Sequence, residues 1–444
     1  MRFFAGYDRM YLRVAMPSAF EGVFMVLLSS VDIIMVGTLG LEAIAAVSIF
    51  TQPRMMLLCV TRSLASAVTL LTARLFGRGE HAPQARMFCQ SLTFGAVVLG
   101  LLHIIFFFQL ESLLVWMGAE PQYLVDALRY GNLALLGVFL TSLATLLQAG
   151  FLGQGRTGLV LWINLWGNGV NCIVNALFIF GLGPFPALGV EGAAVGTVAG
   201  AAYMLLETAR RLRGELRVSR ADFLPDGAFF RSLLPVFGGV FSEQGFERVG
   251  MVLYTRMAAG LGEVPYAVHA IAMNFCDFYY CFAGGLGKAS MVLAGQAYGR
   301  GDTEAWRAYG RAGLRWSLLF STLSFVLTYV LRGEIFWIYT DDAASLPLGM
   351  MVLAFVAVVS FPEAHALVCA GILRGTGQTS AVAAYSFVSV TFLRPLVTAF
   401  LLYELGFGLM GVWLALAFDQ SLRAICSSAL VARLWRKKYL PTAT

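Results

Sequence analysis

The chain has 444 residues, of which 59% are hydrophobic and only 13% charged, and its mean hydropathy is +0.76. Soluble domains carry about 25% charged residues, so this composition excludes a soluble binding protein. The formal charge of +6 would suit nucleic acid, but the basic residues gather between apolar segments, which indicates a membrane protein instead. The seven cysteines have no ligand-like spacing, so we expect no disulfide framework, no metal cluster and no cofactor.

The apolar segments are long enough to cross a bilayer, which takes about 20 residues. In chain order, the twelve predicted transmembrane helices are 14–38, 43–73, 88–108, 127–149, 159–182, 189–209, 233–258, 264–295, 311–331, 348–372, 380–403 and 409–432. They predict an all-α integral membrane protein of two six-helix lobes. The first lobe is expected at 1–215 with the start of a linker, and the second at 216–444, preceded by a cytoplasmic linker.

Short motifs recur at a fixed distance of 222 residues. The sequence FGRGE at 76–80 returns as YGRGD at 298–302, and GQGRT at 153–157 returns as GTGQT at 375–379. Because each half holds an even number of helices, both halves start on the same side and the repeat is parallel. A duplicated apolar chain is typical of a transporter built as two halves around one cavity.

The distribution of Lys and Arg predicts the orientation. One set of connections carries 21 of these residues, whereas the opposite loops carry Arg332 and Arg129. We therefore expect both termini and the 210–231 connection to be cytoplasmic. The 210–231 connection is expected to be a linker, partly helical at the membrane surface. Short interfacial helices are expected within 109–126 and 332–347 on the other side.

Acids and amides in the first half lie where lipid is expected. A charge at the bilayer centre costs about 2.5–3.5 kcal/mol on insertion scales, so Asp32, deep in the first span, is a candidate functional acid. Glu21 precedes it by eleven residues and shares its helix face to within about 20°. The fifth span carries Asn164, Asn168, Asn171 and Asn175 on one face, which must look inward. Neutralisation by a neighbouring helix and interhelical amide bonds are the structural alternatives to a cation site.

In the second half, Glu243 and Glu247 share one face of the seventh span, and Glu363 lies in the tenth. Two interpretations of Glu247 stay open, a functional acid and an ion pair with the adjacent Arg248. Glu243 and Glu363 have no sequence neighbour of opposite charge, which favours a functional role.

Two other classes of protein are considered. Lys288 and Arg394 also fall in spans and keep open a flippase that moves lipid-linked anionic precursors. A membrane transferase acting on polyprenyl phosphates would need paired acids or histidines at the membrane edge. Asp341 and Asp342 are the only such pair and lack partners, so we expect no enzyme.

Several motifs together resemble the multidrug and toxic compound extrusion (MATE) family over nearly the whole chain. The first span runs from Pro17 through Asp32 to Gly37. Asn171 and Asn175 lead into the Gly-rich 189–194 segment. The turns G-x-G-x-T and R-G-x-G-x-T match 153–157 and 374–379, and G-Q-x-x-G matches 295–299.

The resemblance implies two six-helix lobes arranged in a V and export of amphipathic organic cations against an inward flow of H⁺ or Na⁺ by alternating access. It implies an ion site, with Na⁺ as the candidate metal, at Asp32, Asn171, Asn175 and Thr197. The NorM-like branch adds two acids in the second lobe, which match Glu243 and Glu363. Where that branch has a tyrosine four residues before the second acid, this chain has Val359.

The remaining candidate residues complete a transport cycle. The predicted substrate cavity includes Glu21, Asn164, Asn168 and Glu247. Pro17 leaves a backbone carbonyl without its helical partner, so it is a candidate hinge that bends when Asp32 changes charge. We expect a monomeric antiporter in the bacterial cytoplasmic membrane, with small organic cations and lipid rather than nucleic acid as its partners.

Overall fold

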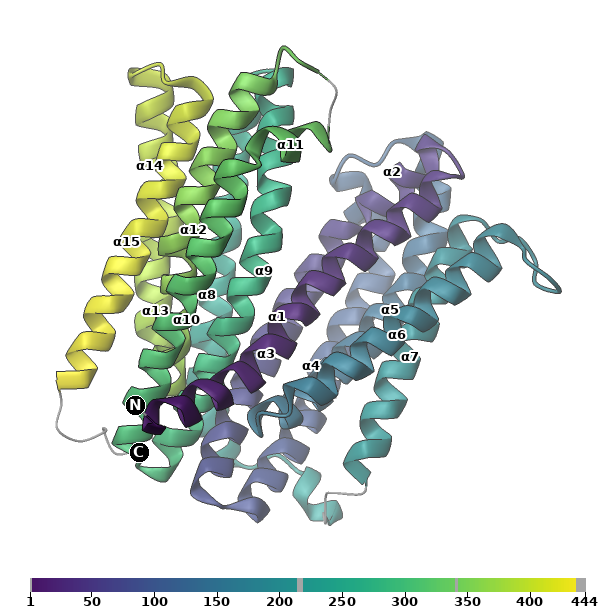
Figure 1. The fold of residues 1–444 in the computed structure, drawn as a ribbon. Helices are drawn as coiled ribbons and strands as arrows, with labels where there is room; N and C mark the ends of the chain where they lie inside the picture. Colours follow the sequence, from purple (N-terminus) through teal and green to yellow (C-terminus); the bar gives the residue numbers. More distant parts are fainter. Residues whose placement is uncertain (1, 214–218, 340–341, 437–444) are drawn as a thin grey trace. The chain divides into compact units, whose positions relative to one another are not determined.

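The computed structural model describes residues 2–213, 219–339 and 342–436, and the described residues form helices joined by short turns (Figure 1). The first half contains α1 (Arg2–Gly37), α2 (Leu41–Ile49), α3 (Thr51–Arg78), α4 (His81–Trp116), α5 (Pro121–Gly153), α6 (Thr157–Phe180) and α7 (Val190–Arg213).

A short 3₁₀ helix, η1 (Arg220–Phe223), leads into the second half. The later helices are α8 (Gly227–Ala259), α9 (Glu263–Arg300), α10 (Thr303–Val330), α11 (Arg332–Trp337), α12 (Leu346–Gly375), α13 (Thr379–Ser386), α14 (Arg394–Ala399) and α15 (Gly408–Arg436). Two π-helical stretches, η2 (Phe387–Leu393) and η3 (Phe400–Glu404), make 379–404 one continuous helical segment with α13 and α14.

The all-helical prediction is confirmed, and each predicted span coincides with a long helical segment. Within the described residues, nine helices are long and apolar enough to cross a membrane by length and composition. The predicted spans at 189–209, 233–258 and 264–295 correspond to the long helices α7, α8 and α9, which fall outside that set. Charged residues such as Glu243, Glu247 and Lys288 interrupt the apolar runs of α8 and α9.

The expected interfacial helices have different outcomes. In 332–347 the structure has the short helix α11, as predicted, whereas the prediction of a separate short helix within 109–126 is wrong. There α4 continues to Trp116, and the chain turns at Gly118 with φ +91° before Pro121 starts α5. The run of Phe and Leu that precedes Trp116 sustains α4, so the polar residues after it form only a turn.

The sequence repeat is visible in the backbone of the turns. Gly79 and Gly301 both adopt left-handed conformations, with φ of +73° and +70°, and each ends a long helix. Gly155 and Gly377 match in the same way, with φ of +80° and +87°. An L side chain is strained in this region, which explains why both copies keep glycine. The two halves therefore share their turn geometry as well as their motifs.

The chain divides into two compact units. Unit 1 contains Met1–Gly22 and Gly238–Thr444, and unit 2 contains Val23–Phe237. Helix α1 therefore begins in unit 1 and ends in unit 2, and α8 begins in unit 2 and ends in unit 1. The division predicted after residue 215 stays a prediction, since the compact units exchange the starts of these two helices.

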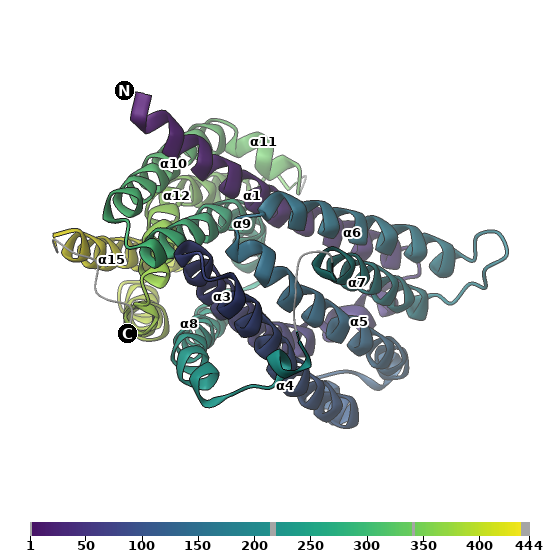
Figure 2. The ribbon, with the colours of Figure 1, turned by 90° about the horizontal axis from the view of Figure 1, so that it is seen from below.

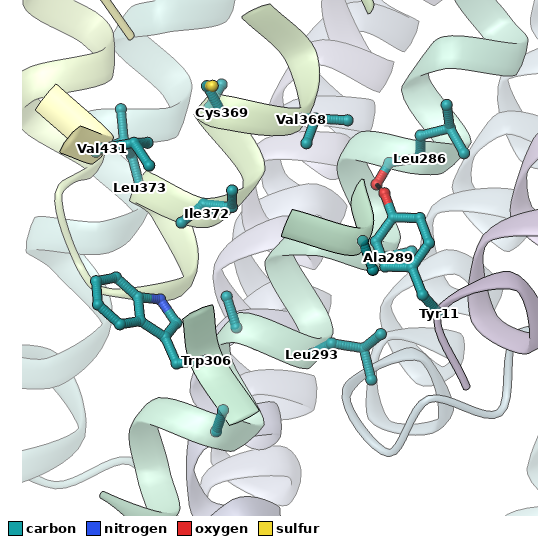
Figure 3. Packing of buried hydrophobic residues seen from close by; sticks show 14 of the residues in the cluster. Tyr11, Leu286, Ala289, Leu293, Trp306, Val368, Cys369, Ile372, Leu373 and Val431 are labelled. Atoms are coloured by element: carbon teal, nitrogen blue, oxygen red, sulfur yellow. Dashed lines mark hydrogen bonds between the residues drawn. The ribbon is translucent and has the colours of Figure 1, made fainter. Parts of the chain in front are cut away.

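The start of α1 is built into the core of unit 1. Tyr11 is fully buried, and its hydroxyl donates to the Leu286 carbonyl at 2.8 Å and lies 2.9 Å from the Ser290 hydroxyl (Figure 3). Asp8 accepts two 2.8 Å hydrogen bonds from Arg315 of α10. These contacts tie the first turns of α1 to α9 and α10.

The start of α8 is held in unit 2 in a comparable way. Phe94 of α4 contacts the rings of Phe229 and Phe230 edge to face. The Gln90 side chain donates to the Leu224 carbonyl at 2.9 Å, and η1 packs on α4. The prediction that the 210–231 connection is partly helical is confirmed by η1, while Arg217 lies outside the described residues.

Candidate cation sites in the two units

Asp32 and the amide face of α6 meet in unit 2. The Asn175 amide donates to Oδ1 of Asp32 at 2.8 Å and also contacts Oδ1 of Asn171 at 3.3 Å. Asn175 and Asn171 are buried, whereas Asp32 is half-buried. The Oδ1 atom of Asn175 has no hydrogen-bond partner among the described residues. The Oδ1 atoms of Asp32 and Asn171 thus converge on Nδ2 of Asn175, while Oδ1 of Asn175 lies on the side of Gly196 with its acceptor capacity unused.

Two glycines of α7 make room for this arrangement. A Cβ atom at Gly196 would lie 1.9 Å from Oδ1 of Asn175, and one at Gly200 would lie 2.8 Å from Cβ of Asn171. Figure 2 shows α6 and α7 side by side, and their backbones approach closely because these positions carry no side chain. The four-residue spacing of Gly196 and Gly200 is a sequence signal for this close packing that the amide stripe alone does not contain.

The other candidates of unit 2 have different surroundings. Asn164 accepts a 2.7 Å hydrogen bond from Gln148 of α5, and the Asn168 amide donates to the Asn164 carbonyl at 2.7 Å. The Thr197 hydroxyl donates at 3.0 Å to the Ala193 carbonyl of its own helix. The four amides therefore share one helix, but only Asn171 and Asn175 join Asp32.

Arg54, near the start of α3, is a charged neighbour that sequence analysis did not connect with the site. It interacts electrostatically with Asp32, as does the buried Tyr130 of α5. Nothing in the sequence spacing links residues on α1, α3 and α5. Glu21 is half-buried in the part of α1 that belongs to unit 1, as is Pro17, so Glu21 and Asp32 belong to different units.

Unit 1 contains a buried network of acids and arginines. Arg374 bonds Glu243 through two nitrogens, with its Nε 3.1 Å from Oε2. Arg394 bonds Asp419 in the same way, with its Nε 3.1 Å from Oδ2. Arg423 forms an ion pair with the remaining carboxylate on α8, that of Glu247.

The network corrects two expectations. Glu243 has no sequence neighbour of opposite charge, which favoured a functional role, but Arg374 bonds it across 131 residues of sequence. For Glu247 the expected partner was the adjacent Arg248, but the structure pairs it with Arg423. The expectation failed because helices bring together residues that are far apart in the chain. Asp419, which is fully buried, was missed altogether.

Glu363 differs from the other three acids. It is 5% exposed, and its Oε2 lies 4.0 Å from the Cys276 thiol. No guanidinium in the described part of the chain bonds it. The network therefore holds four carboxylates but three guanidiniums, and Glu363 is the acid left without an arginine partner among the described residues.

The structure accounts for one of the two basic residues that kept an anionic substrate open. Arg394 is 2% exposed and its charge is balanced by Asp419, whereas Lys288 is exposed on α9. Asp341, one of the two acids weighed for a transferase, lies outside the described residues. A separate cavity of about 240 Å³ in unit 1 is lined by Ser317, Leu318, Phe361, Pro362, His365 and Ala424, none of which is a candidate acid.

Comparisons with known proteins identify the family of the chain. The family model MatE matches residues 17–177 and 239–400. The probable multidrug resistance protein NorM of Rhizobium meliloti is 26% identical over 429 residues, which cover 92% of this chain and 90% of the relative. The multidrug resistance protein NorM of Vibrio cholerae is also 26% identical, over 430 residues that cover 93% of each chain.

Solved structures show the same fold. A multidrug resistance MATE family transporter in an outward-facing conformation has a TM-score of 0.89 at 19% identity, with 97% of each chain covered. The Vibrio cholerae MATE transporter VcmN has a TM-score of 0.90 at 15% identity, with 99% of each chain covered. With the family model matched in both halves of the sequence, the chain belongs to the MatE family and is a membrane transporter rather than an enzyme.

Proposed function

We propose that this protein is a secondary antiporter that exports amphipathic organic cations in exchange for H⁺ or Na⁺ by alternating access. The observation that carries the proposal is the carboxylate of Asp32, which accepts a hydrogen bond from Asn175 inside the helical core of unit 2. The names of the relatives, multidrug resistance proteins, supply the substrate class. We place the protein in the bacterial cytoplasmic membrane as a monomer with both termini in the cytoplasm.

Coupling follows from competition at a carboxylate. Asp32 holds a proton or a sodium ion, or else balances the charge of an organic cation, but it does not serve both cations at once. For Na⁺, the oxygens of Asp32 and Asn171 that accept from Nδ2 of Asn175 are suitable hard ligands, and rotation of the Asn175 amide would add its Oδ1, which has no partner among the described residues. Thr197 and the half-buried Asn164 and Asn168 extend the polar surface of the same unit.

The first experiment measures ethidium efflux from proteoliposomes under an imposed pH gradient and, separately, an imposed sodium gradient. We expect efflux under one gradient and its loss in Asp32→Asn, because the amide holds neither a proton nor the charge of a bound cation. Pro17→Ala is assayed in parallel, and unchanged transport there would remove the hinge from the mechanism. Efflux that persists in Asp32→Asn would contradict the role of this acid.

The flippase is the alternative function that the same experiment tests. It would need a binding surface with free cations, whereas the three arginines of the network in unit 1 are each bonded to an acid. Absence of ethidium efflux under both gradients, with folded protein, would favour the flippase and direct attention to the exposed Lys288.

A further inference from the structure

The unequal charges of the network in unit 1 are the starting point. Four acids face three arginines, and each arginine is bonded to one acid. A buried carboxylate without a partner is strongly disfavoured, so the described arrangement is stable when Glu363 carries a proton. If Glu363 loses that proton, the network holds one uncompensated negative charge, which a nearby guanidinium must neutralise.

The surroundings of Glu363 determine which arginine can neutralise its carboxylate. Helix α15, which carries Arg423, packs against α12, which carries Glu363. Arg423 and Arg394 attract the Glu363 carboxylate, while Asp277 and Asp419 repel it. Among the described residues, the charged and titratable groups that interact with Glu363 are Cys276, Asp277, Tyr279 and Tyr280 on α9, Arg394 on α14, and Asp419 and Arg423 on α15. Of the two arginines, Arg394 is held by two hydrogen bonds to Asp419 and is fixed in place.

Arg423 has a donor to spare. It bonds Glu247 through Nη2, while its Nε is buried and has no hydrogen-bond partner among the described residues. Its side chain is 8% exposed, so this orphan N–H is not satisfied by bulk solvent. Because a buried donor without a partner is costly, ionisation of a carboxylic acid on the neighbouring helix favours a change of partner for Arg423.

The two acids that compete for Arg423 differ in accessibility. The side chain of Glu247 is 25% exposed, whereas Glu243, Glu363 and Asp419 are all 5% exposed or less. Tyr280, 39% exposed, interacts electrostatically with Glu247 more strongly than with any other charged group. An accessible carboxylate beside an aromatic ring is the chemistry that binds organic cations.

We propose that Arg423 is a switch that exchanges Glu247 for Glu363 and thereby admits the organic cation to Glu247 only after Glu363 has released its proton. This inference rests on the proposed antiport function and names its coupling ion in unit 1 as H⁺. With Glu363 protonated, Arg423 masks Glu247. With Glu363 ionised, Arg423 moves to it and the Glu247 carboxylate, beside Tyr280, binds the substrate cation.

The exchange balances in charge. The O–H bond of Glu363 breaks and its proton passes to water, while Arg423 keeps its proton throughout and only changes its hydrogen-bond acceptor. One organic cation then replaces one proton, so the total charge of the network stays constant. Sodium is disfavoured here because two arginines lie near Glu363, and the acid expected to share the ion, Glu243, is bonded to Arg374.

The test isolates unit 1 by using Asp32→Asn as the background for every variant. Ethidium binding to purified protein is measured by fluorescence polarisation between about pH 6 and 9, together with proton release to a pH dye in weak buffer. In the background protein we expect binding to tighten as pH rises, up to about tenfold per pH unit for one exchanged proton. One proton should be released for each ethidium bound.

The variants separate the three roles. Glu363→Gln, a permanent mimic of the protonated acid, should bind weakly at every pH and release no proton. Arg423→Gln should bind tightly at every pH, since nothing masks Glu247, and Glu247→Gln should abolish binding in this background. Arg210→Gln, which removes an arginine from a surface pair with Glu207, is the matched control and should follow the background protein.

The outcomes also separate this inference from the proposed function. Retention of pH-dependent binding and proton release in Glu363→Gln would overturn the switch, even if the wild-type protein transports ethidium. If Arg423→Gln does not fold, the isosteric Glu363→Gln still tests the switch. The double variant Glu247→Gln/Arg423→Gln removes both charges of the pair and should show no ethidium binding. Failure of the wild-type protein to exchange ethidium under either gradient would instead reject the antiport function.

Discussion

Glycine at residue 196 shows how one absent side chain shapes the site of unit 2. Alanine at this position would place its Cβ 1.9 Å from Oδ1 of Asn175, far inside van der Waals contact. The clash involves a buried amide that bonds Asp32, so relief requires either rotation of Asn175 or separation of α6 from α7. Both responses would disturb the oxygens that converge there.

We predict that Gly196→Ala lowers stability by about 1–3 kcal/mol, the usual range for overpacking, and impairs ethidium transport. Thermal unfolding in detergent and efflux from proteoliposomes measure the two effects. Gly169→Ala on α6 is the matched control, since a Cβ there meets nothing within 4 Å, and it should leave both unchanged or raise stability slightly. Equal behaviour of the two variants would show that the close approach of α6 and α7 is unimportant.

Sequence analysis predicted part of the candidate sites because some of their signals are local. Asn171 and Asn175 lie one turn apart on one helix, so helix periodicity predicts that they share a face. The cost of an acid in lipid singles out Asp32 as a residue that must face the protein interior. The partners of Glu243 and Glu247 lie 131 and 176 residues away. Such pairings depend on which helices are neighbours, and the sequence of a single chain does not state this.

At the scale of elements, the linker docked on α4 fixes the start of α8. Asp226 accepts a 2.8 Å hydrogen bond from the Phe229 amide at the first turn of α8 and a 2.9 Å hydrogen bond from Arg86 of α4. The Phe229 amide, together with Gln90 and Arg86, holds the pKa of Asp226 below its usual range. The Asp226 carboxylate thus caps the first turn of α8 and links α8 to α4.

We predict that Asp226→Ala lowers the unfolding temperature at pH 7 and that this difference shrinks on acidification. Because the pKa of Asp226 is lower in the folded state, its contribution is present above about pH 4 and is lost as pH falls further. Thermal unfolding of both proteins at pH 7 and at stepwise lower pH measures this. Asp226→Asn keeps a capping side chain but no charge, so it should lose less. A difference between wild type and Asp226→Ala that stays constant with pH would contradict the ionic contribution.

The boundaries of elements were harder to predict than their existence. Apolar length alone locates every long helix, since a span needs about 20 residues whatever its neighbours are. The same reasoning misjudged 109–126, where helix α4 continues well beyond the predicted span. The same apolar length predicted one helix at 43–73, where Phe50 separates α2 from α3. Helix ends depend on turn residues such as Gly118, whose effect hydropathy does not report.

At the scale of the whole molecule, duplication and charge placement predict the topology. The turns at Gly79 and Gly301 share their backbone conformation, as expected if equivalent loops of the two halves lie on the same side. The excess of Lys and Arg beside these turns predicts that they lie in the cytoplasm.

This orientation is tested with single cysteines in a protein whose seven native cysteines have been replaced. Cysteines at the exposed positions Glu80 and Asp302 should react with a membrane-impermeant maleimide only in lysed cells. Cysteines at Glu120 and Phe185 should react in intact spheroplasts. Labelling of Glu80→Cys from outside would reverse the predicted topology.

The exchange of helix starts between the units has a consequence for biosynthesis. Unit 1 needs Tyr11 and its neighbours in α1 as well as α9, α10 and α12, which the ribosome makes hundreds of residues later. The opening turns of α1 must therefore wait in the membrane, unpacked, until the second half has been inserted. Either half expressed alone would therefore lack a segment that completes its core.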